Sequence, residues 1–231
     1  MLFSVSHMLI QSSVITVNTL TAPSDAAFAP VVKGVSAATG IEGFANIAVN
    51  AVGQAAVCFV GQNAGAQNYK RVRSVRRCCY LIGAGAAILF GSLLILARAP
   101  LFSLYGIHRA ALGSVERMAY DAAEIRTFYM LVPYIFLAFM EVGSGTMQGL
   151  GRAVTAACVS LAGSCVFRVV WLLAVFPKHQ TLACIFVSFP LSWLLTAAVH
   201  FICAEVILKR LERASESAKT EKQLLTAADK K

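Results

Sequence analysis

Long apolar stretches alternate with short polar ones along this chain of 231 residues. Four stretches contain no Asp, Glu, Lys or Arg: residues 1–24, 43–69, 78–97 and 179–204. Two others contain a single charged residue each, Glu141 within 127–151 and Arg168 within 153–177. A helix needs about 20 apolar residues to cross the hydrocarbon core of a bilayer, and all six stretches are long enough. The pattern therefore predicts six membrane-spanning segments.

Helices, rather than barrel strands, are the spanning elements that this pattern favours. Barrel strands alternate apolar and polar residues over about 10 positions, and the apolar stretches show no such alternation. Pro133 and Pro190 fall inside spans, where kinks are tolerated if neighbouring groups satisfy the freed carbonyls. The fold class is therefore an all-α, polytopic membrane protein, with residues 1–208 as the membrane unit and 209–231 as a charged tail. The predicted spans are approximately 2–20, 38–63, 78–97, 127–150, 153–176 and 181–208.

Composition supports a membrane protein. Hydrophobic residues make up 58% of the chain and charged residues 13%, whereas soluble domains have roughly 45–50% and about 25%. The seven cysteines all lie in or beside spans, without CxxC pairs or histidines at metal-ligand spacing. They are typical of packing residues, so we expect no metal site and no cofactor apart from a coupling ion.

The net charge of +9 comes from residues beside the spans. Lys and Arg gather between the second and third spans, at 70–77, and after residue 208. Anionic membrane lipids are the ordinary partner of such residues, and no nucleic-acid recognition fold accompanies them, so we expect no nucleic-acid binding. Basic residues favour the cytoplasmic side, which predicts a plasma (inner) membrane protein with both termini in the cytoplasm. The four Arg between the third and fourth spans do not fit this orientation, since it places that loop on the opposite side of the membrane.

Glu141 is the clearest candidate for a functional site. It lies nine residues from one end of its span, about 13–14 Å at 1.5 Å per residue, and so near mid-depth. Helical spacing places Tyr134 and Gln148 on the same face. A buried acid of this kind suits proton or sodium coupling. The alternative is an acid that an interhelical hydrogen bond holds for packing.

Amides on the first two spans are further candidates. Gln11 and Gln54 each lie nine residues from the same membrane side, so they are predicted to share a level with Glu141, and Asn50 lies near them. Glu42 is expected near the outer interface, where it stays hydrated. Three polar groups at one depth would suit a cavity between helices. Interhelical packing, worth about 0.6 kcal/mol for each hydrogen bond, is the alternative.

Arg168 lies about six residues, or roughly 9 Å, further out than Glu141, so a direct ion pair between them is not expected. Carbonyl groups, Tyr134 or water are its expected partners. His200 is more typical of a packed imidazole than of a proton relay. The GxxxG motifs 61–65 and 145–149 permit close approach of helices and, without a preceding strand, do not indicate nucleotide binding.

Several motifs resemble the multidrug and toxic compound extrusion (MATE) family. In Val60–Ala66 the sequence VGQNAGA, followed by 68–71, resembles the "GQN-GA" end of a lobe's second helix. Residues 36–38 and 41–44 resemble the approach to that helix, and 143–151 the "G-LRG-G" end of the tenth. The resemblance extends to about residue 208. It implies one six-helix lobe, helices seven to twelve, of a transporter of the MOP superfamily.

The resemblance implies export of organic cations and drugs in exchange for H⁺ or Na⁺, and no enzymatic activity. Family members combine two lobes, so transport implies a second lobe or a homodimer. Gln11 falls near the place of an acid in helix seven of some members, and Glu141 lies about one turn from the usual acid of helix ten. The alternatives are a flippase for lipid-linked saccharides of the same superfamily, or a non-transporting membrane protein.

Overall fold

The computed structural model describes the backbone of residues 2–21, 29–110 and 113–228, and the side chains of 8–21, 29–110 and 113–217. Within these ranges the secondary structure is helical, without a strand. The elements are, in order, α1 (Leu2–Thr21), α2 (Pro30–Gly65), α3 (Tyr69–Leu96), α4 (Arg98–Leu104), α5 (Val115–Leu131), α6 (Tyr134–Gly149), α7 (Ala153–Ser160), the π-helix η1 (Leu161–Val166), α8 (Phe167–Ala174), the 3-10 turn η2 (Phe176–Lys178) and α9 (Leu182–Ala228).

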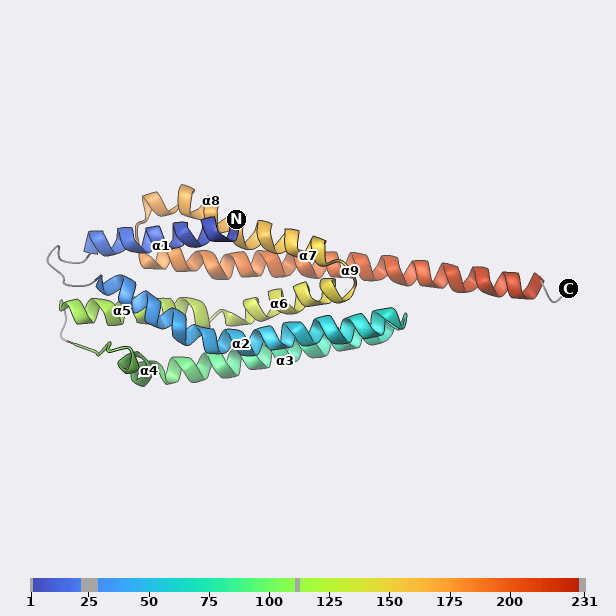
Figure 1. Cartoon of the computed structure of the whole chain (residues 1–231), viewed down its shortest axis with the longest axis horizontal. Helices are drawn as coiled ribbons and strands as arrows, with labels where there is room; N and C mark the ends of the chain where they lie inside the picture. The colour runs from blue at the N-terminus through green and yellow to red at the C-terminus, as the bar shows by residue number, and fades with distance from the viewer. Residues whose placement is uncertain (1, 22–28, 111–112, 229–231) are drawn as a thin grey trace.

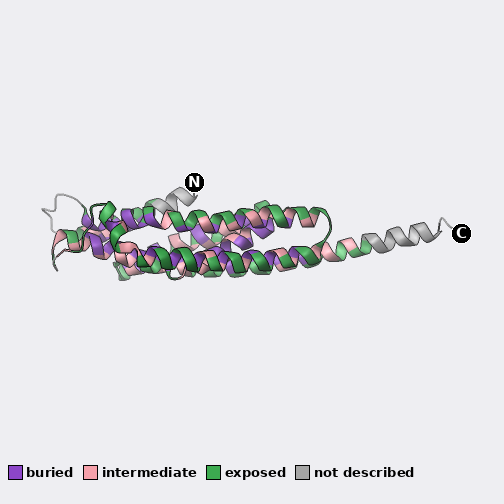
Figure 2. Cartoon of the chain, turned by 90° about the horizontal axis from the view of Figure 1, so that it is seen from below, coloured by how far each residue is buried: buried purple, intermediate pink, exposed green. Residues whose placement is uncertain are grey.

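The long helices lie alongside one another in an elongated bundle, and α9 projects beyond it toward the C-terminus (Figure 1). Helix α2 packs against α3, α5 and α6, and α9 packs against α5 and α6. Buried residues follow the sides of the helices that face the bundle interior (Figure 2). Large apolar side chains remain exposed on the outer sides; Leu81 and Ile88 of α3 are 74% and 61% exposed. Such faces suit contact with lipid hydrocarbon.

The predicted spans correspond to helices. Four helical stretches are long and apolar enough to cross a membrane: Pro30–Gly65, Tyr69–Leu96, Ala153–Lys178 and Leu182–Ser217. The bent pair α5–α6 makes a fifth if it counts as one span. The remaining predicted span, 2–20, is helix α1, whose side chains before Met8 lie outside the described residues. The all-α membrane architecture is confirmed. By length and composition, four of the described helices can span a membrane, or five with the bent pair, against six predicted spans.

Several helices are longer than the apolar stretches that predicted them. Helix α2 begins at Pro30 rather than at residue 38, and α3 begins at Tyr69 rather than at 78. Asn68 caps α3, because its side chain accepts a hydrogen bond from the Arg71 N–H at 3.2 Å. Helix α9 continues through residue 208 without a break. Hydropathy marks where a chain meets lipid, but a capped helix continues beyond that point.

Proline and glycine shape the connections. Helices α5 and α6 meet at a 48° bend. The bend falls at Pro133, where the sequence tolerates a kink, because proline cannot donate a backbone hydrogen bond. Pro190 lies within α9. Gly151, with φ of +76°, forms the turn between α6 and α7. After this turn, the next span consists of α7, η1 and α8. Gly163 of η1 lies directly against Thr196 of α9.

Candidate functional site

A seam of glycines brings α2 and α6 into close contact. A Cβ atom added to Gly145 would lie 2.4 Å from the Gly53 carbonyl oxygen, and one added to Gly149 would lie 2.8 Å from the Val57 carbonyl oxygen. The motif 145–149 is therefore a packing motif, as predicted. In the motif 61–65 only Gly61 takes part, since a Cβ on Gly65 would meet nothing within 4 Å.

This seam positions Glu141. The Glu141 Cβ would lie 3.3 Å from a Cβ built on Gly53, so the acid sits directly opposite α2. Its side chain is partly exposed and makes no hydrogen bond or ion pair with another residue of the described ranges. Gln54 follows Gly53 and is exposed. The prediction that Gln54 and Glu141 share a level along the bundle is confirmed.

Gln11 does not share that level. The Asn18 side chain of α1 accepts a hydrogen bond from the Val31 N–H of α2 at 3.1 Å, and the two helices run in opposite directions (Figure 1). Gln11 lies seven residues from this point, about 10 Å, whereas Gln54 lies 23 residues away, about 35 Å. The predicted three-helix layer was wrong for Gln11, because the 20-residue α1 pairs with the start of the 36-residue α2 and extends along only part of it.

The other polar candidates lie in contrasting surroundings. Asn50 and Gln54 of α2 are exposed, and so is Gln148 of α6, whose Nε2 donates to the Ser144 hydroxyl at 3.1 Å. Tyr134, the first residue of α6, is fully buried. Its ring packs edge-on against Trp193 at 5.9 Å between centroids. The predicted polar strip on α6 is thus exposed at Gln148 and buried at Tyr134.

The Tyr134 hydroxyl is buried without a hydrogen-bond partner among the described residues. Buried hydroxyl groups in native proteins are usually hydrogen-bonded, so a neighbouring polar side chain is the expected partner. The side chains of Asn46 and Glu42 are close enough to interact with this hydroxyl. Tyr134 therefore belongs to the polar interior that surrounds Glu42 rather than to the open face of α6.

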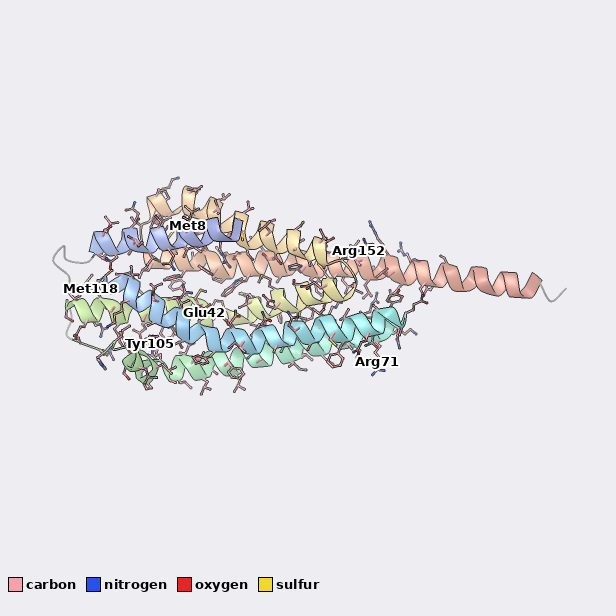
Figure 3. All side chains as sticks on the ribbon, viewed as in Figure 1. Met8, Glu42, Arg71, Tyr105, Met118 and Arg152 are labelled. Atoms are coloured by element: carbon pink, nitrogen blue, oxygen red, sulfur yellow. The ribbon has the colours of Figure 1, made fainter. Side chains whose placement is uncertain are left out.

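Glu42 is central to a charged cluster that the sequence did not predict. Its Oε2 accepts a hydrogen bond from Arg126 Nη2 of α5 at 2.8 Å, and the two side chains are 14% and 9% exposed (Figure 3 labels Glu42). The expectation of a hydrated Glu42 at the outer interface was wrong. Because α2 begins at Pro30, Glu42 lies three turns inside the helix. Arg126, assigned to a loop from the sequence, lies within α5.

Arg168 completes the cluster on α8. Its Nε donates to the Ser192 hydroxyl at 3.0 Å, and its guanidinium lies 4.0 Å from the centroid of the Phe189 ring. Arg126 faces the same ring at 5.9 Å. No ion pair between Arg168 and Glu141 occurs in the described part of the chain, as the sequence predicted. With Glu42, the two arginines give this cluster a net charge of one positive unit.

His200 is a packed residue, in agreement with the structural interpretation of the sequence. It is fully buried, with its Nε2 3.1 Å from the Ser160 hydroxyl and its Nδ1 3.2 Å from the Met147 sulfur. A Cβ on Gly143 would approach the His200 Cβ to 2.8 Å, so α6 and α9 touch at this point. All seven cysteines are free thiols. No three potential metal ligands come together in the described ranges.

The helices are long and apolar, their outer faces are apolar, and a few charged residues lie in the interior. These features define a polytopic membrane protein. The chain belongs to the MatE family, whose model matches residues 5–172. Members of this family are membrane transporters rather than enzymes, and the helical architecture here agrees with that class. No match was found among curated proteins or among solved structures.

Proposed function

We propose that this chain exports organic cations, including drugs, across the plasma (inner) membrane in exchange for H⁺ or Na⁺. The main support for this proposal is Glu141. It is a mid-span acid without a cationic partner among the described residues, and it belongs to a chain of the MatE family. By contrast, the other mid-span acid, Glu42, is neutralised by Arg126. An unpaired carboxylate in a membrane can bind a proton, a sodium ion or a cationic substrate in turn.

The position of Glu141 suits coupling to helix movement. Its backbone carbonyl and Cβ face Gly53 across the seam, so small shifts of α6 against α2 would change the surroundings of the carboxylate. Gln54, at the same level, supplies an amide that can bind an ion or a substrate. In this proposal Glu141 and Gln54 form the coupling site, whereas Asn50 and Gln148 line the approach to it.

Alternating access requires two lobes that move relative to each other. We therefore propose that the six predicted spans work with a second set, either in a partner lobe or in a second copy of this chain. In the proposed orientation both termini are cytoplasmic, and Arg71, Arg77 and Arg210 lie on the cytoplasmic side, as the positive-inside rule favours.

Transport in proteoliposomes tests the proposal. The purified protein is reconstituted, and uptake of a fluorescent organic cation is measured with an imposed proton or sodium gradient. We expect gradient-driven accumulation, and its loss in Glu141→Gln. Glu116→Gln is the matched control, since Glu116 is an exposed acid of α5 outside the seam. Equal transport by Glu141→Gln would reject the coupling role, and absence of transport in every preparation would favour a non-transporting membrane protein.

A flippase for lipid-linked saccharides is the second candidate function. Its support is the net positive charge of Arg126, Arg168 and Glu42, because the ligand would carry a pyrophosphate. Arg126 is already paired, which leaves Arg168 as the main phosphate ligand and makes this function the weaker candidate. Translocation of a fluorescent lipid pyrophosphate that Arg168→Gln abolishes and Glu141→Gln does not would favour the flippase.

A further inference from the structure

A hollow of about 350 Å³ lies between the start of α7 and the side of α9, at the end of the bundle from which α9 projects (Figure 3 labels Arg152 beside it). Its walls combine two arginines with mainly apolar side chains. The lining residues are Arg152, Thr155, Ile202, Cys203, Val206, Ile207, Arg210 and Leu211.

The two arginines differ from the five arginines that are ion-paired in the described ranges. Arg73, Arg76, Arg98, Arg117 and Arg126 each form an ion pair with an acid. The side chains of Arg152 and Arg210 are exposed and make no hydrogen bond or ion pair with any residue in the described ranges. Two guanidinium groups at one hollow therefore remain available for an anion, and planar guanidinium donors match phosphate oxygens well.

The backbone adds to the positive potential at this point. Arg152 is the N-cap residue of α7, and no side chain caps the helix there. The first N–H groups of a helix carry a partial positive charge, which favours an anion nearby. This contribution strengthens the site that the two arginines form.

The remaining walls are suited to hydrocarbon. Ile202 and Val206 are 60% and 44% exposed, and they lie on the face of α9 that extends from Arg210 back into the apolar span. A hydrocarbon chain lying along this face would cover them. A ligand with a phosphate at the arginines and an acyl chain toward Ile202 satisfies both parts of the hollow.

We propose that this hollow binds one anionic phospholipid, with the phosphate between Arg152 and Arg210 and an acyl chain against Ile202 and Val206. Charge complementarity and the adjoining apolar wall identify the lipid as the occupant. The proposal is independent of the transport function, since neither arginine belongs to the site around Glu141. The bound lipid would hold the start of α7 against α9.

Native mass spectrometry of the purified full-length chain, titrated with phosphatidylglycerol, tests this assignment. We expect one retained lipid, and a loss of apparent affinity of about fivefold for each arginine and about 25-fold in Arg152→Gln/Arg210→Gln. Arg77→Gln/Lys209→Gln removes the same charge at the same end but alters no lining residue, so its affinity should stay close to that of the wild type. Val206→Trp keeps both arginines and fills the hollow, and we expect it to weaken retention too.

Three results would overturn the proposal. Unchanged retention in Arg152→Gln/Arg210→Gln would show that the arginines do not hold the lipid. Equal losses in the control pair would show general attraction to a basic surface. Displacement of the lipid by glycerol 3-phosphate at the concentration of the lipid itself would show a site for free phosphate, without a contribution from the acyl chain.

Discussion

Glu42 and Arg126, 84 residues apart in sequence, form an ion pair at 2.8 Å that joins α2 to α5 inside the bundle. The Arg126 guanidinium also lies 5.1 Å from the Phe186 ring of α9. Three helices that the chain connects only through long segments thus meet at one charged contact. Its burial makes the pair important for stability, because each charge would be costly without the other.

Breaking this pair should destabilise the protein more than removing it. We expect Glu42→Gln to lower the free energy of unfolding by about 3–5 kcal/mol, because it leaves the Arg126 charge buried without a partner. The double variant Glu42→Gln/Arg126→Gln should lose less than Glu42→Gln alone, and therefore much less than the sum of the two single variants. Denaturant unfolding in detergent micelles measures both. Strict additivity of the two losses would contradict the inferred coupling.

The seam between α2 and α6 should not tolerate a methyl group at Gly145. A Cβ there would lie 2.4 Å from the Gly53 carbonyl oxygen, so Gly145→Ala must push the helices apart, at a cost of about 1–3 kcal/mol. Gly85→Ala on α3 is the control, since its Cβ would meet nothing within 4 Å. That variant should gain about 0.5–1 kcal/mol from helix propensity. Melting temperatures that shift equally in both variants would refute the close contact.

Two ion pairs between α3 and α9 should differ strongly in their contribution. Arg76, paired with Glu205, is 5% exposed, whereas Arg73, paired with Glu212, is 37% exposed. Because water screens the outer pair, Arg73→Gln should cost at most about 1 kcal/mol. Arg76→Gln should cost about 1.5–3 kcal/mol, since it removes a charged hydrogen bond from a buried side chain but leaves behind Glu205, which is 27% exposed. Unfolding of the two variants side by side measures the difference. A larger loss in Arg73→Gln would contradict this ranking.

The Phe189 ring should be coupled energetically to Arg168. Their separation of 4.0 Å is that of a close cation–π contact, which is worth about 1 kcal/mol. A double-mutant cycle of Phe189→Leu with Arg168→Gln should give a coupling energy of that size. Phe186→Leu with Arg168→Gln is the control, since Phe186 contacts Arg126 instead. Similar coupling energies in the two cycles would remove the specific role of Phe189.

Local chain chemistry determined which segments are helical and where one of them bends. A segment in hydrocarbon must satisfy its backbone hydrogen bonds internally, so each apolar stretch predicted a helix. Pro133 lacks an N–H group, and the 48° bend lies there. The helices and the bend need no knowledge of neighbouring helices. Gly145 permits a close approach because it has no side chain, but only the packed bundle decided which glycines are used, since a Cβ on Gly65 would meet nothing within 4 Å.

Contacts between helices depended on tertiary structure, because rotation and axial offset decide which side chains meet. One residue turns a helix by about 100° and advances it by 1.5 Å, so the eight additional residues at the start of α2 place Glu42 three turns inside that helix, where it meets Arg126. The pairing of α1 with the start of α2 separates Gln11 from Glu141. The sequence by itself therefore determined the helices and their polar residues, whereas only the packed bundle decided that Glu42 is paired and that Glu141 has no ionic partner among the residues that the structure describes.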